Sequence, residues 1–147
     1  MSMSSLRNAS ALPDRLKGAL PAFAAAVAFW GLASTLLYFL APGLDTWPRL
    51  LVFHECVGLT MMACALVLLR SGRFDRFRPA LRWPLIGLIA IPVGYFVGHQ
   101  FAFVALGEPM RMVGHQQISL IPILFTVLAG GIALNYFATR ETLAREA

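Results

Sequence analysis

The sequence predicts an all-α integral membrane protein, a four-helix bundle that crosses the bilayer in up-down-up-down order. Two observations predict this fold class. First, 59% of the 147 residues are hydrophobic and 13% are charged, whereas soluble chains carry roughly 45–50% apolar and about 25% charged residues. Second, the charges cluster between four apolar runs, each near the roughly 20 residues that a membrane-crossing helix needs. Backbone inside lipid must pair its own polar groups, so each run is expected to be helical, and short loops favour antiparallel neighbours.

Prolines and glycines mark the ends of these runs. Pro21 and Pro84 fall at the starts of the expected first and third spans, where the missing N–H costs little, and Pro48 lies at the entrance of the second. Pro42-Gly43 ends the first run, whereas no proline or glycine interrupts the chain after the fourth. The expected organisation is a cytoplasmic N-terminal segment (1–19), a transmembrane domain (20–138) with spans at about 20–41, 50–69, 83–106 and 117–138, and the start of a cytoplasmic helix (139–147).

The basic residues predict the orientation. Ten of the twelve lie in the N-terminal segment, in the linker between the second and third runs, and in the C-terminal tail. Only Arg49 and Arg111 lie on the opposite side. Loops rich in arginine and lysine stay in the cytoplasm, so both termini are expected there. The net charge of +5 is then explained by topology and by contacts with anionic lipid, and nucleic acid is not an expected partner.

Small residues line one side of the third run. Gly94 and Gly98 are four apart, and Ala102 continues the pattern. This spacing lets two helix backbones approach closely in a membrane. It leaves two interpretations open: packing against another helix of the same bundle, or the seam of a homodimer.

The ionisable residues of the runs are expected near the outer surface. His54 and Glu55 lie in the first turns of the second run, His99 lies in the outer third of the third run, and His115 opens the fourth. Such groups usually face the bundle interior or water. His54 and His99 differ in expected depth by about 4–5 Å at 1.5 Å per residue. We therefore expect that His54, Glu55 and His99 can face one another, with His115 capping the group.

Three interpretations of this polar group remain. It is a metal site with additional cysteine or methionine ligands, a protonation switch, or a set of interfacial residues bonded across helices and to headgroup water. The spacing matches no compact metal motif, and the chain lacks a second histidine pair for a transmembrane heme path, so the cofactor remains unknown. No nucleophile–base pair or phosphate loop is present, so no catalytic residue is predicted. Glu55 is the one acidic residue inside the runs, which disfavours a transport function.

Three stretches resemble a known family. Cys56-Val57-Gly58-Leu59, the stretch Ile91 to Gly98 (IPVGYFVG), and the tail from Asn135 to Ala147 resemble the N-terminal four-span membrane module of LytS/AlgZ-type bacterial sensor histidine kinases. The likeness covers most of residues 20–147 and consists of hydrophobic and glycine patterns.

The resemblance implies a signalling function. The chain would be the sensor domain of a two-component system in a bacterial inner membrane, passing an outer or intramembrane stimulus to a cytoplasmic helix. The phosphoacceptor histidine and ATP-binding domain of the family would lie beyond Ala147, so a cytoplasmic kinase domain is the expected downstream partner. The alternative is a small stand-alone membrane protein that binds a metal or heme through the outer histidines.

Overall fold

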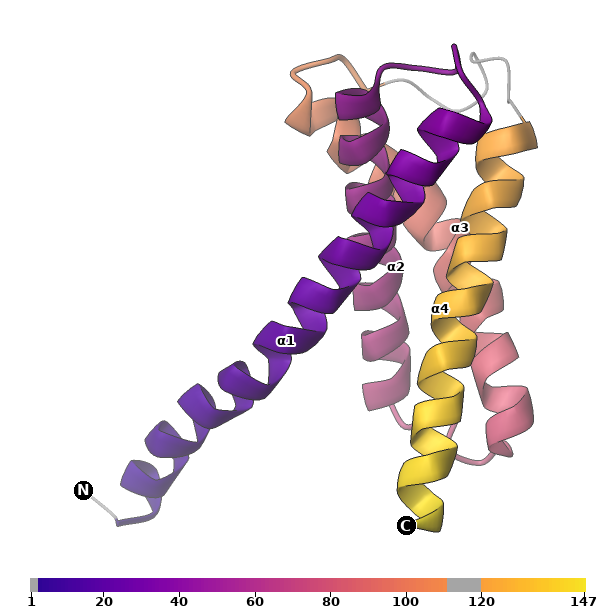
Figure 1. The fold of residues 1–147 in the computed structure, drawn as a ribbon. Coiled ribbons are helices and arrows are strands. Elements are labelled where there is room, and N and C mark those ends of the chain that lie inside the picture. The colour runs from indigo at the N-terminus through magenta and orange to yellow at the C-terminus, as the bar shows by residue number, and fades with distance from the viewer. Residues whose placement is uncertain (1–2, 111–119) are drawn as a thin grey trace.

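The computed structural model describes residues 3–110 and 120–147. These residues form four helices and no strand: α1 (Met3–Leu40), α2 (Trp47–Arg70), α3 (Pro79–Ala105) and α4 (Leu120–Glu146). Successive helices run in opposite directions (Figure 1). The predicted all-α four-helix bundle is therefore confirmed.

Prolines begin two of these helices and glycines follow three of them. A proline occupies the first turn of α2 and of α3, and Pro79 explains why α3 begins four residues before the predicted span at 83. Gly43, Gly72 and Gly107 have φ angles of 92°, 68° and 68°. Residues with a side chain rarely adopt this left-handed conformation, so glycine is the residue suited to the end of a helix.

The helices have the length and composition of membrane spans. Each contains an apolar segment long enough to cross a bilayer, and only 17–33% of each segment is buried inside the protein. Large apolar side chains such as Leu32, Leu88 and Leu128 point outward. A water-soluble bundle would turn such side chains inward. By length and composition, the chain is a multi-pass membrane protein.

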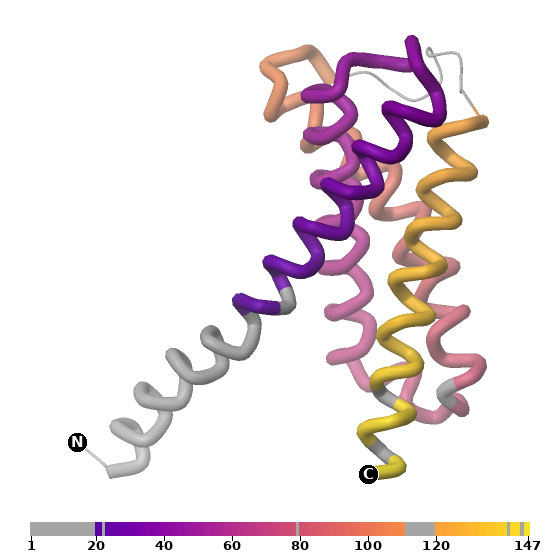
Figure 2. Tube along the Cα trace, in the orientation of Figure 1, coloured from indigo at the N-terminus to yellow at the C-terminus, as the bar shows by residue number. Residues whose placement is uncertain are grey.

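Helix α2 is the centre of the bundle. It packs most extensively against α3 and less extensively against α1, while α4 packs mainly against α3. In Figure 2, the coloured part of α1 crosses α2 obliquely, whereas α2, α3 and α4 run closer to a common direction. The side chain of Trp30 anchors α1, because its indole ring covers Gly58 so closely that a Cβ there would lie 2.2 Å from the ring.

The small face of α3 packs inside the bundle. A Cβ at Gly94 would lie 2.7 Å from the Cβ of Met61, and a Cβ at Gly98 would lie 2.5 Å from the Cα of Val57. Ala102 is fully buried. The structure therefore shows the first interpretation of this spacing, a contact between α2 and α3 of one chain.

The two ends of the bundle differ. The connection 41–46 and the end of α3 lie at one end, which we call the Arg49 end (Figure 1). The connection 71–78 and the end of α4 lie at the other, which we call the Arg82 end.

Candidate functional site

His54 lies inside the bundle near the Arg49 end. Its side chain is 5% exposed, and its ring meets the ring of Phe125 edge to face, with 5.7 Å between centroids. The Nδ1–H of His54 donates to the carbonyl of Leu50 at 2.8 Å. Because a carbonyl only accepts, this bond places the proton of the neutral ring on Nδ1 and leaves Nε2 as an acceptor. His54 thus joins α2 to α4.

His99 has the same local arrangement on α3. Its Nδ1–H donates to the carbonyl of Tyr95 at 2.6 Å. The ring lies 4.3 Å from the ring of Tyr95 and 5.2 Å from that of Phe53, measured between centroids. In its neutral form, this ring therefore also leaves Nε2 as an acceptor, in a largely aromatic setting.

The side chain of Glu55 faces α1. Its Oε1 would lie 3.4 Å from a Cβ at Gly31, which places the carboxylate against α1. Its Oε2 is buried and has no hydrogen-bond partner among the described residues. Adjacent residues of an α-helix project about 100° apart, at 3.6 residues per turn, so Glu55 and His54 serve different interfaces. The structure places the Glu55 carboxylate against α1, and a site formed by His54, Glu55 and His99 stays a prediction.

The described residues hold no group of three or more His, Cys, Asp or Glu side chains that could bind a metal ion. Cys56 and Cys64 are free thiols. His115, the expected cap of the group, lies outside the described residues, as does Arg111. The histidines that the structure does describe contact aromatic rings and backbone carbonyls.

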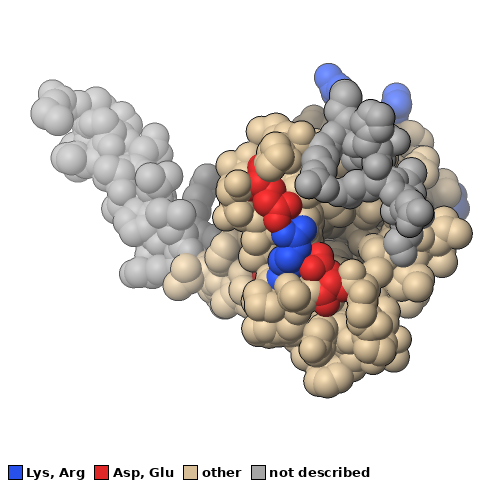
Figure 3. Space-filling view, turned by 90° about the horizontal axis from the view of Figure 1, so that it is seen from above, with Lys and Arg blue, Asp and Glu red and all other residues tan. Residues whose placement is uncertain are grey.

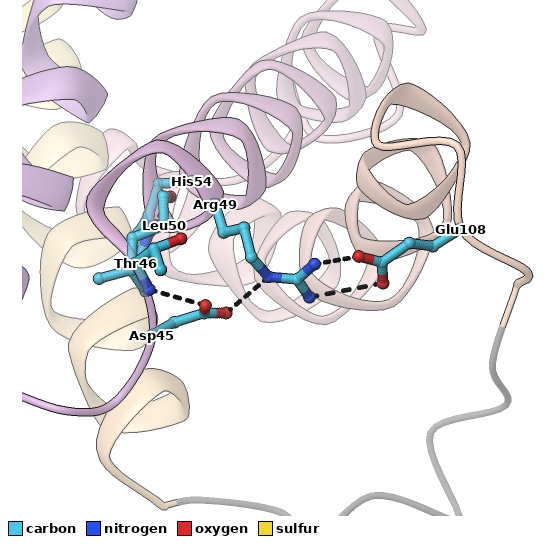
Figure 4. Close-up of polar contacts among 6 residues, drawn as sticks. All are labelled: Asp45, Thr46, Arg49, Leu50, His54 and Glu108. Atoms are coloured by element: carbon cyan, nitrogen blue, oxygen red, sulfur yellow. Dashed lines mark hydrogen bonds and ion pairs between the residues drawn. The ribbon is translucent and has the colours of Figure 1, made fainter.

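A charged group that sequence reasoning missed closes the Arg49 end. The guanidinium of Arg49 donates from Nε to Asp45 Oδ2 at 3.1 Å and from its two Nη atoms to the carboxylate of Glu108 (Figure 4). Asp45 also accepts the backbone N–H of Thr46 at 2.7 Å. Figure 3 shows the blue side chain between two red ones on this face. Arg49 therefore ties the connection before α2 to the segment after α3.

The signal for this ion pair was present in the sequence. Asp45 lies four residues before Arg49, a spacing that brings the two side chains together at the start of a helix. Glu108 directly follows the expected end of the third span. Antiparallel second and third spans bring Glu108 to the same end as Arg49, whereas the positive-inside rule uses Arg49 only to predict topology.

A second ion pair lies at the Arg82 end. Arg82 is buried, with a side chain that is 7% exposed, and its Nη1 donates to Asp75 Oδ1 at 3.3 Å. Next to it, the ring of Trp83 stacks on that of Phe137 at 6.4 Å between centroids, with 15° between planes. These contacts join the connection 71–78, α3 and α4 at the end where α4 finishes.

Comparison of the chain with protein-family models, with curated proteins and with solved structures finds no match.

Proposed function

We propose that the chain is the transmembrane sensor domain of a bacterial two-component histidine kinase, which passes an outer or intramembrane stimulus to a cytoplasmic helix. The observation that carries the proposal is the length of α4. Its 27 residues extend about 40 Å at 1.5 Å per residue, about 10 Å more than a bilayer core of about 30 Å. We place this excess at the C-terminal end of α4, where Arg140 and Arg145 follow the apolar run, so that the last turns project beyond the hydrocarbon region.

The packing of α4 supports an output function. A helix that transmits a signal needs two arrangements that a stimulus can favour differently. The α2–α3 pair touches backbone to backbone at Gly94 and Gly98, which leaves little room for movement. By contrast, α4 packs less extensively and meets α2 through side chains, including the ring contact between His54 and Phe125. We infer that α4 moves against a fixed α2–α3 pair.

The basic residues support the direction of signalling. Five arginines lie between 70 and 82, and Arg140 and Arg145 follow on α4. The positive-inside rule then favours the Arg82 end as cytoplasmic. A stimulus at the Arg49 end would reach the cytoplasm through α4.

The first test is the coding sequence that follows Ala147. A phosphoacceptor histidine and an ATP-binding domain in frame with α4 would support the proposal, and a stop codon would overturn it. A second test places spin labels at Ser71 and Leu143, which are exposed at the Arg82 end. Two distance populations whose ratio changes with bilayer thickness or outer pH would support a mobile α4.

One observation favours a second function, the binding of a metal or heme. Both His54 and His99 donate Nδ1–H to a backbone carbonyl, the arrangement that usually orients a ligating histidine. Elemental analysis and visible absorption of the purified protein test this function directly. A stoichiometric metal or a heme band that disappears in His54→Ala and His99→Ala would favour it over the sensor proposal.

A further inference from the structure

An apolar groove lies between α3 and α4. Its volume is about 570 Å³, within the roughly 300–1,000 Å³ of small-molecule sites. Asn135 contributes one of its few polar side chains. The walls include Trp83, Gly87 and Ile91 from α3 and Val127, Gly131 and Leu134 from α4.

The groove has the depth of one lipid leaflet. Its lining extends from Ala80 to Pro92 on α3 and from Val127 to Ala138 on α4. At 1.5 Å per residue, these stretches are about 17–18 Å long. Half of a hydrocarbon core of about 30 Å is of similar depth. The groove thus extends from the Arg82 end to about the middle of the membrane.

A glycine keeps part of the groove empty. A Cβ at Gly131 would meet no atom within 4 Å, so a side chain there would project into open space. At Gly87, a Cβ would lie 2.7 Å from the Cδ1 of Leu134. Larger residues at these positions would fill the space between α3 and α4.

One arginine lies near the end of the groove at Ala80 and Ala138. Arg78 is the N-cap residue of α3, two residues before Ala80, and its side chain is exposed. Arg140 follows Ala138 by two residues, which places it on the opposite face of α4, with its guanidinium 5.9 Å from the centroid of the Tyr136 ring. The nearby carboxylate of Asp75 is engaged by Arg82. Positive charge therefore lies where a lipid headgroup would meet the groove.

We propose that this groove binds one acyl chain of an anionic phospholipid, and that Arg78 holds its phosphate. Leaflet depth, apolar walls and a cationic mouth match the shape and charge of such a lipid together. The proposal does not depend on a signalling function, because it concerns binding alone.

Photo-crosslinking in vesicles tests the proposal. The full chain is reconstituted with phosphatidylglycerol or phosphatidylcholine that carries the same photoreactive acyl chain, and adducts are mapped by mass spectrometry. We expect adducts concentrated at groove residues such as Leu88 and Val127, and more of them with phosphatidylglycerol. Even labelling along all exposed helix faces would show ordinary boundary lipid and would overturn the proposal.

Variants of the groove and variants of its charged end test the two parts of the proposal separately. Gly131→Phe should abolish groove adducts, whereas Ala63→Phe, at an exposed position on α2, should leave them unchanged. Arg78→Gln should lower the preference for phosphatidylglycerol by about fivefold, whereas Arg140→Gln, on the opposite face of α4, should leave it unchanged. An unchanged preference in Arg78→Gln would overturn the assignment of the phosphate to this arginine.

A second copy of the chain is the rival occupant of the groove. Gly131→Cys, in a chain whose Cys56 and Cys64 are replaced by alanine, tests it in the same vesicles. If a lipid occupies the groove, oxidation should yield monomers. Efficient disulfide-linked dimers would place a second α4 in the groove and would overturn the proposal.

Discussion

At the scale of single residues, Gly98 determines how closely α2 and α3 approach. The atoms nearest to an added Cβ are backbone atoms of Val57 and Cys56, which cannot move aside as the end of a flexible side chain can. We predict that Gly98→Leu lowers the free energy of unfolding in detergent by about 1–3 kcal/mol, the usual cost of overpacking. Gly131→Leu, which enters open space, is the matched control and should cost less.

The same variant tests the homodimer interpretation of the Gly94–Gly98 spacing. Because these glycines contact α2 of their own chain, Gly98→Leu should leave the oligomeric state unchanged in chemical crosslinking. A variant that loses a dimer but keeps wild-type stability would place the glycines at a seam between chains instead.

The ion pairs of Arg49 should contribute only modestly to the free energy of unfolding, although Arg49 has two carboxylate partners. The side chains of Arg49 and Glu108 are 35% and 28% exposed, and partly solvated ion pairs are usually worth about 0.2–1 kcal/mol. We predict a coupling energy in that range from a double-mutant cycle of Arg49→Ala and Glu108→Ala, measured by unfolding at low salt. A cycle of Arg73→Ala and Glu108→Ala, at opposite ends of the bundle, should show none. Zero coupling in the first cycle would mean that the pair does not hold the Arg49 end together.

Hydropathy and depth along a span do not determine the direction in which a side chain points, as Glu55 shows. Its position near the expected outer surface predicted a meeting with His54 and His99, because depth along a span follows from counting residues. The direction of the side chain depends on which helix lies beside each face of α2. That arrangement is a property of the packed bundle, so the contact with Gly31 could not be read from spacing within one span.

At the scale of helices, the runs of apolar residues predicted the elements well. The second span was expected at about 50–69, and α2 extends from Trp47 to Arg70. The differences lie at the ends, since a helix continues into the interface until a proline or a glycine stops it. The small face of α3 was also foreseeable, but its partner was not. Spacing identifies a surface for close approach and does not identify the helix that meets it.

Met61 links three helices. It is 3% exposed, its Cβ abuts Gly94 on α3, and its Sδ would lie 2.9 Å from a Cβ at Gly130 on α4. We predict that Met61→Ala destabilises the bundle by about 2–5 kcal/mol, as buried Met→Ala changes do in soluble cores. Met61→Leu, which nearly conserves volume, should cost less than about 1.5 kcal/mol.

Hydrogen exchange would show which helix is destabilised most by Met61→Ala. Because α4 has fewer contacts with the rest of the bundle than α3 has, its amides near Gly130 should lose protection before those of α3 near Gly94. Equal loss in both helices, or none in α4, would contradict the proposal that α4 is the more mobile helix.

At the scale of the whole molecule, the account depends on the orientation of the bundle in the membrane. If α4 delivers a signal to the cytoplasm, its C-terminal end and the arginine-rich connection 71–78 must lie there together. Composition predicts this arrangement through ten basic residues against two. The two ends can be distinguished at exposed residues that tolerate cysteine, Thr46 at the Arg49 end and Ser71 at the Arg82 end.

The most direct measurement is therefore the labelling of single cysteines in intact cells with a maleimide that does not cross membranes. In a chain with Cys56 and Cys64 replaced by alanine, we predict that Thr46→Cys reacts from outside and that Ser71→Cys reacts only after the membrane is opened. Labelling of Ser71→Cys in intact cells, with Thr46→Cys protected, would reverse the orientation and contradict the proposed direction of signalling. Labelling of both from outside would contradict the crossing of the membrane by α2.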